Sequence, residues 1–222
     1  MPRFAAGVVR FQNEVFPEKR ALFEKLSHGQ SPEALFITCS DSRIETAMIT
    51  QTEPGELFIV RNAGNIVPPH VVNAGGITAS IEFAAAALNV PHIVICGHTG
   101  CGAMEGALKP ELLKTLPHVR EWLAHAQGAL DYVDQNSEGL SEDERMALLL
   151  EENVRLQLEH LKTHPSVAAR IKKGDVQLHG WVYDIKTGGV EAWDEDQQKF
   201  LPVDERYAAE MAALAAGDCR GK

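Results

Sequence analysis

The chain has 222 residues, of which 21 are Lys or Arg and 31 are Asp or Glu, giving a formal net charge of −10. This length suits one domain with helical extensions, and 45% hydrophobic content is typical of a globular protein. The acidic balance argues against nucleic acid or an anionic membrane surface as the main partner. No apolar run reaches the length of a membrane span, and the N-terminus lacks the pattern of a signal peptide, so we expect a cytoplasmic protein.

The first 30 residues are predicted to form a helical arm. Apolar side chains recur there at helical spacing, and Pro17 suits the first turn of a second helix. The stripe consists of Phe4, Val8, Phe11 and Val15. Such a stripe needs a covering surface, which is either the core of the same chain or a second copy across a dimer interface.

Three short apolar runs follow, Ala34–Thr38, Glu56–Val60 and Pro91–Cys96. They do not alternate polar and apolar residues, which is typical of parallel strands covered on both faces. A helical pattern separates the second run from the third. This order predicts an α/β fold, with a mainly parallel central sheet flanked by helices and preceded by the N-terminal helical extension.

The remainder of the chain is predicted to add helices and one hairpin. Leu112–Val133 and Glu142–Lys162 carry helical patterns, and two extended runs flank a turn at Thr187–Gly189. A last helix is expected near Glu205–Ala216, before a polar tail. We therefore divide the chain into residues 1–30, the arm, and residues 31–222, a single α/β domain.

Chemically unusual residues follow two of the predicted strands. Cys39 ends the first strand, and His98 and Cys101 follow the third. Ligand sites in open parallel sheets lie beyond the carboxyl ends of strands, so neighbouring strands would bring these side chains together. Two thiolates and one imidazole are the ligand set of a catalytic zinc site, which leaves a fourth position open.

Asp41 and Arg43 strengthen this interpretation. An arginine two residues from an aspartate can hold its carboxylate with paired hydrogen bonds and keep it ionised. A surface ion pair is the simpler alternative. The segment from Cys39 to Arg43 is too short for a phosphate-binding loop, and the absence of a C-x-x-C pattern argues against a redox pair. Cys96, inside an apolar run, fits a core residue better than a ligand.

These motifs together resemble the β-class carbonic anhydrases, in the branch that includes plant and cyanobacterial members. The resemblance rests on C-x-D-x-R after the first strand, R-N-A-G-N after the second and H-x-x-C after the third, and it resumes at LHGWVYDI. It implies reversible hydration of carbon dioxide to bicarbonate and a proton. It further implies one Zn²⁺ per subunit, with residues 31–222 as the zinc-binding catalytic domain.

The resemblance also assigns roles by position. Cys39, His98 and Cys101 match the zinc ligands, and Asp41 and Arg43 match a dyad that orients the attacking water. Four further positions match groups that contact substrate: Gln30, Phe58, Phe83 and the backbone N–H of Gly102. In this family the glutamine comes from a neighbouring subunit, and the N-terminal helices embrace a partner. We therefore expect a homodimer or a dimer-based higher oligomer.

Some positions depart from the family pattern. Phe83 stands where plant members often have tyrosine. Phe36 replaces a tryptophan of a regulatory bicarbonate site, although Arg61 and Tyr183 occupy its other positions. The resemblance favours an open form with Asp41 paired to Arg43 over a closed form in which Asp41 ligates zinc.

Two alternatives and one role stay open. The same zinc site could hydrolyse carbonyl sulfide or carbon disulfide, or the chain could be a non-catalytic zinc scaffold. A structural ion would not require Asp41, Arg43 or Gln30, which disfavours the scaffold. His28 and His70 are candidates for a proton shuttle only because they neighbour the motif segments.

Overall fold

The computed structural model describes residues 1–71 and 75–218, so Cys219 lies outside the described residues. Its centre is a six-stranded sheet with the strand order β2-β1-β3-β4-β5-β6. The strands are β1 (Ala34–Cys39), β2 (Leu57–Asn62), β3 (His92–His98), β4 (Gln177–Tyr183), β5 (Val190–Asp194) and β6 (Lys199–Pro202). The first four in the spatial order are parallel and β5 and β6 are antiparallel, which confirms the predicted mainly parallel α/β sheet.

Both faces of the sheet carry apolar side chains, as the unbroken apolar runs predicted. Every residue of β1 is buried. Leu35 and Ile37 face the main core, which also contains side chains of the long helix α9. Phe36 points to the other face, where it packs with Val94 and the buried Cys96. Cys96 is thus a core residue, and burial raises the pKa of its thiol to about 12.

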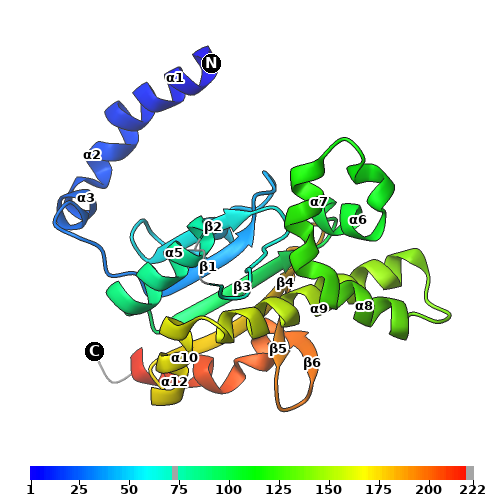
Figure 1. Ribbon diagram of the computed structural model, residues 1–222. Helices are drawn as coiled ribbons and strands as arrows, with labels where there is room; N and C mark the ends of the chain where they lie inside the picture. The colour runs from blue at the N-terminus through cyan, green and yellow to red at the C-terminus, as the bar shows by residue number, and fades with distance from the viewer. Residues whose placement is uncertain (72–74, 219–222) are drawn as a thin grey trace.

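Helices surround this sheet and cover its ends (Figure 1). They are α4 (Thr46–Thr50), α5 (Gly76–Glu82) with the π-helical turn η2 (Phe83–Ala87), α6 (Gly102–Leu108), the 3₁₀ turn η3 (Pro110–Leu113), α7 (Pro117–Leu123), the 3₁₀ turn η4 (Ala124–Ala126), α8 (Gln127–Asn136), α9 (Glu142–Lys162), α10 (Pro165–Lys173), α11 (Val203–Arg206) and α12 (Ala208–Asp218). Helix α9 has the predicted bounds and begins with a capping box between Ser141 and Glu144.

Two regions differ from the sequence prediction. The single helix expected over Leu112–Val133 is wrong, because Pro117 starts a new helix and a 3₁₀ turn separates α7 from α8. The hairpin around Thr187 is present as β4 and β5, but β6 was not predicted. Four residues with a proline at the end carry too short a pattern to identify a strand.

The N-terminal arm projects away from the body of the molecule (Figure 1). It contains α1 (Pro2–Arg10), the π-helical turn η1 (Phe11–Val15), α2 (Phe16–Glu18) and α3 (Arg20–Leu26). Phe4 is 69% exposed and Val8 is 56% exposed, so the predicted apolar stripe is not covered by the chain's own core. Among the residues described, no helix combines the length and apolarity that crossing a bilayer requires.

Candidate metal centre

The carboxyl ends of β1 and β3, which point toward α6 and α7 in Figure 1, bring three donors to one place. β1 and β3 are direct neighbours in parallel register, with Thr38 opposite Cys96. Cys39 therefore ends its strand beside His98, and Cys101 precedes the first turn of α6. The Sγ atoms of Cys39 and Cys101 lie 3.9 Å apart, and the donor atoms of all three residues lie within 4.8 Å of one another.

The turn between His98 and Cys101 depends on a glycine. Gly100 has a φ of +65°, in the left-handed region that side chains disfavour. Its carbonyl oxygen accepts a hydrogen bond of 2.9 Å from Nη2 of Arg43. The turn therefore aims both donors at one point and ties the C-x-D-x-R segment to the H-x-x-C segment.

His98 presents one ring nitrogen to this cluster. Its Nδ1 lies 3.0 Å from the carbonyl oxygen of Thr99, which can only accept, so Nδ1 carries the proton. Nε2 then has a free lone pair; it is buried and has no hydrogen-bond partner within the described part of the chain. A buried nitrogen without a partner is costly in an interior, and a metal ion would satisfy it.

The two thiols are electrostatically coupled. The Cys101 thiol, His98 and the Gly64 amide lower the pKa of Cys39 against the opposing effect of burial. The Cys39 thiolate and burial raise the pKa of Cys101. Without a cation the pair therefore favours one thiolate and one thiol. A bound divalent cation would favour loss of the second proton, because it stabilises both sulfurs as thiolates.

The dimensions of this cluster fit zinc. Two sulfurs bound at about 2.3 Å to a tetrahedral ion lie about 3.8 Å apart, close to the 3.9 Å between Cys39 and Cys101. The group of His, Cys, Asp and Glu donors found in the described residues holds three members and not four. Three donors with an open fourth position are typical of catalytic zinc sites rather than structural ones.

Asp41 and Arg43 form a rigid pair beside the cluster. Asp41 Oδ1 accepts hydrogen bonds from the backbone N–H and from Nε of Arg43, both at 2.9 Å, and Oδ2 accepts one of 2.7 Å from Nη2. These bonds hold the pKa of the Asp41 carboxyl well below its usual range. Oδ2 lies 3.9 Å from His98 Nε2. The structure thus has Asp41 ionised, aimed at the cluster and paired with Arg43.

Arg61 has a role that the sequence did not reveal. Its guanidinium donates to three backbone carbonyls, those of Cys39, Asp41 and Ile44, at 3.1, 2.8 and 2.6 Å. Arg61 therefore holds the C-x-D-x-R segment in place. These bonds use Nε and Nη2 of the guanidinium. Phe36, at another position of the regulatory bicarbonate site, is buried against Trp181.

Of the predicted substrate contacts, Gly102 lies beside the cluster, whereas Phe58 and Phe83 lie far from it. Gly102 is the first residue of α6, directly after Cys101, so its N–H lies outside the helical hydrogen-bond ladder. Phe58 pairs with Leu35, four residues before Cys39, which places it roughly 13 Å along the sheet from the cluster. Phe58 and Phe83 pack together with their ring centroids 5.9 Å apart.

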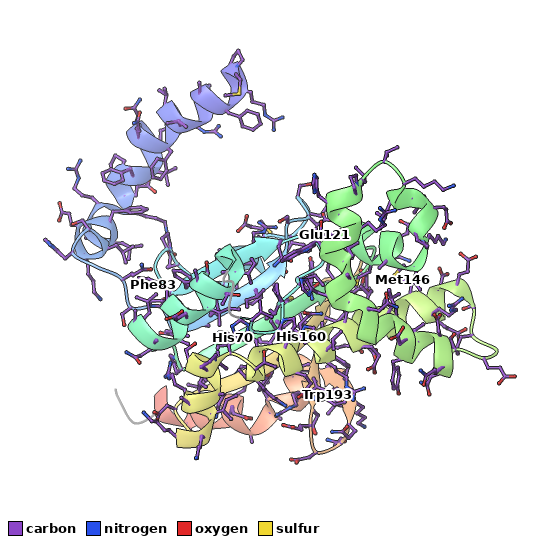
Figure 2. All side chains as sticks on the ribbon, in the orientation of Figure 1. His70, Phe83, Glu121, Met146, His160 and Trp193 are labelled. Carbon is purple, nitrogen blue, oxygen red and sulfur yellow. The ribbon has the colours of Figure 1, made fainter. Side chains whose placement is uncertain are left out.

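Gln30 lies on this same remote side, because it precedes the amino end of β1. Figure 2 shows Phe83 near the base of the arm, away from α6 and α7. Within one chain these three residues therefore do not join the Cys-His-Cys cluster.

The structure places neither shuttle candidate at the cluster. His28 follows the arm helix α3. His70 packs edge-on against His164, with the ring centroids 5.7 Å apart, and lies near His160 in Figure 2.

Comparisons with known proteins agree with this geometry. The family model for carbonic anhydrase matches residues 34–190. A carbonic anhydrase from Pseudomonas aeruginosa is 46% identical over 90% of this chain and 90% of its own length. One from Synechococcus elongatus is 47% identical over 86% of this chain and 70% of its own length. The solved structure of the beta-carbonic anhydrase CcaA is 43% identical, covers 91% of this chain and 98% of its own, and superposes with a TM-score of 0.88.

The beta-carbonic anhydrase of Coccomyxa, solved with acetazolamide, is 29% identical with a TM-score of 0.76. The structural alignment covers 96% of this chain and 96% of the Coccomyxa chain. Family model, sequence identity and fold thus agree over most of the chain, and we conclude that this chain belongs to the β-class carbonic anhydrases.

Proposed function

We propose that the chain catalyses the reversible hydration of carbon dioxide to bicarbonate and a proton, with one Zn²⁺ per subunit held by Cys39, His98 and Cys101. The observation that carries this proposal is the buried three-donor cluster with the ionised Asp41 carboxylate beside it. A zinc ion, when bound, lowers the pKa of a water ligand toward neutrality and so supplies a nucleophile at physiological pH.

The remaining steps belong to the protein's own side chains. Because Arg43 keeps Asp41 ionised, the Asp41 carboxylate can only accept a hydrogen bond from the attacking water. Accepting that bond directs the water's lone pair away from Asp41 and toward carbon dioxide. The N–H of Gly102 would donate to an oxygen of the bicarbonate product. Asp41 is not a zinc ligand in this proposal.

A second chain would complete the substrate pocket. Gln30, Phe58 and Phe83 lie at the opposite end of the strands from the cluster of their own chain, yet the family resemblance makes them substrate contacts. β2 is an edge strand, and the side chain of Ile59 on it is 44% exposed. We therefore propose a homodimer or dimer-based oligomer, in which residues 1–30 embrace the partner and residues 31–222 form the catalytic domain.

Hydration of carbon dioxide can be tested by stopped-flow assay of metal-quantified protein. Asp41→Asn should retain one zinc per chain but lose about 10²- to 10³-fold in kcat/KM, because the amide can also donate to the water and misdirect it. Asp134→Asn is the matched control, since Asp134 forms an exposed ion pair with Arg145 away from the cluster. Full activity of the Asp41 variant would contradict the role assigned to this carboxylate.

The same preparations should be assayed with carbonyl sulfide and carbon disulfide. Turnover of these substrates without hydration of carbon dioxide would overturn the substrate assignment and leave the zinc site intact. A zinc-free preparation that kept both activities would overturn the role of the metal.

A further inference from the structure

The sulfur of Cys39 accepts a hydrogen bond from the protein backbone. The donor is the N–H of Gly64, at 3.5 Å from Sγ. Gly64 follows β2 and has a φ of +81°, and a Cβ atom there would lie 2.8 Å from Cε of Met104. The left-handed backbone at this position favours glycine.

A tryptophan from a distant helix holds the peptide that carries this N–H. Nε1 of Trp122, in α7, donates a hydrogen bond of 2.9 Å to the carbonyl oxygen of Ala63. The Ala63 carbonyl and the Gly64 N–H belong to the same peptide group. The indole and the Cys39 sulfur thus lie at opposite ends of one peptide dipole, where each hydrogen bond strengthens the other.

An asparagine holds the next peptide from the other side. Nδ2 of Asn153, in α9, donates a hydrogen bond of 3.1 Å to the carbonyl oxygen of Gly64. Asn153 is 1% exposed, and Gln157 fixes its orientation through a bond of 2.9 Å from Nε2 to Asn153 Oδ1. Gln157 Oε1 in turn accepts the N–H of Val67 at 2.8 Å.

Two polar amides on the buried side of α9 need a reason, because an apolar side chain there avoids the cost of desolvation. Both amides bond to the loop that follows β2, and this loop donates the Gly64 N–H to the sulfur of Cys39. Trp122 thus lies one peptide away from a predicted zinc ligand, and Asn153 holds the peptide that follows it.

We propose that Trp122 and Asn153 are positioning residues for Cys39, acting through the Gly64 N–H to orient the thiolate and withdraw negative charge from its sulfur. This rests on the proposed role of Cys39 as a zinc ligand. A sulfur that donates less charge leaves the bound cation a stronger Lewis acid. Trp122 on α7 and Asn153 on α9 therefore set how much charge the Cys39 sulfur can donate to a bound cation.

The test uses Co²⁺ as a spectroscopic substitute for zinc in the full-length chain. Trp122→Phe keeps an aromatic ring and removes the N–H donor together with part of the ring volume. Asn153→Leu is similar in shape and removes the other donor, along with the acceptor of Gln157 Nε2. Each variant should shift the sulfur-to-cobalt charge-transfer band to longer wavelength, because a less stabilised thiolate gives up an electron more easily. Each should also weaken zinc binding about 10-fold in competition with a chromophoric chelator, because the loss of a pre-oriented Cys39 outweighs the gain in charge on its sulfur.

Trp193→Phe is the matched control, because the Trp193 ring centroid lies 4.5 Å from Cζ of Arg155 and Figure 2 shows Trp193 well away from Glu121 of α7. It should leave both the band and the zinc affinity unchanged. Thermal unfolding of the metal-free variants separates a general loss of stability from an effect on the sulfur. If Asn153→Leu does not fold, Trp122→Phe alone decides the proposal.

A folded Trp122→Phe protein with the wild-type band and zinc affinity would overturn the proposal, even if its unfolding temperature fell. If the wild-type protein itself showed no thiolate-to-cobalt band, the proposed zinc site would fail instead. The two failures are therefore distinguishable.

Discussion

Strand β3 begins and ends with a histidine, and the two side chains have opposite hydrogen-bonding situations. At the amino end, Nδ1 of His92 lies 3.1 Å from Nε2 of His179, whose Nδ1 lies 2.8 Å from the Tyr207 hydroxyl. Trp181 Nε1 donates to the same hydroxyl at 3.1 Å. Because an indole can only donate, a consistent chain of donors runs from Trp181 through Tyr207 and His179 to His92.

At the carboxyl end, His98 has one satisfied nitrogen and one that is buried without a partner among the described residues. Two cysteine sulfurs face that second nitrogen. A group of polar residues with a complete set of hydrogen bonds stabilises the fold by itself, whereas an incomplete buried set requires a ligand. The difference between the two ends of β3 thus separates a structural cluster from a metal centre, although both contain histidine.

The largest expected effect follows from removing a metal donor. His98→Ala should lose bound zinc and reduce carbon dioxide hydration to the uncatalysed rate, and Cys39→Ser should do the same. His92→Gln, at the other end of the strand, should keep one zinc per chain. Elemental analysis of purified protein measures this, and zinc retained by His98→Ala would remove the distinction between the two clusters.

The next largest effect concerns the residue that aims Asp41. Arg43→Ala should retain zinc, because Arg43 does not bind the metal, and should lower kcat/KM about 10- to 100-fold as Asp41 loses its orientation and part of its charge stabilisation. Arg145→Ala removes a partly exposed arginine elsewhere and should have no such effect. An Arg43→Ala enzyme as fast as wild type would show that Asp41 needs no partner.

The amino-end cluster should instead control stability as a function of pH. Burial, then His92 and Arg206, lower the pKa of His179 from 6.5 to about 4, and Glu210 opposes this. Between pH 4 and pH 6.5 the unfolded chain therefore binds more protons than the folded chain. Neutral His179 contributes its full share to the free energy of unfolding above about pH 6.5. This contribution, at most about 3 kcal/mol, is lost as the pH falls toward 4.

Unfolding by urea at pH 7.0 and 5.0 measures this loss. The free energy of unfolding of wild type should fall more steeply between these values than that of His179→Gln, with other titrating groups cancelling in the comparison. Equal slopes would contradict a buried, neutral His179.

The smallest effect should come from the hydroxyl in the middle of the chain of donors. Tyr207→Phe leaves Trp181 Nε1 and His179 Nδ1 without their shared partner, which should lower the free energy of unfolding by about 1–3 kcal/mol. Zinc content should not change. A Tyr207→Phe protein that lost zinc would show that the two ends of β3 are coupled.

Local patterns in the sequence were sufficient to predict the parallel sheet and the three candidate metal donors. Unbroken apolar runs mark strands buried on both faces, and residues that end neighbouring parallel strands must meet at one edge. The same reasoning could not identify Arg61, Trp122 or Asn153. Their bonds to backbone carbonyls join segments between 17 and 89 residues apart, and no local pattern records which carbonyl a side chain will reach.

Helix boundaries and subunit contacts were the other limits. Apolar spacing over residues 112–133 suggested one helix, although Pro117 ends the continuity locally. The position of Phe58 relative to the cluster follows from strand register, which the sequence does not specify.

X-ray absorption at the zinc edge, on metal-quantified wild-type protein, tests the central claim most directly. The account predicts one zinc per chain, bound by two sulfurs near 2.3 Å, one imidazole nitrogen and one further light atom that does not come from a protein carboxylate. A folded chain without zinc, or a zinc shell containing fewer than two sulfurs, would contradict it.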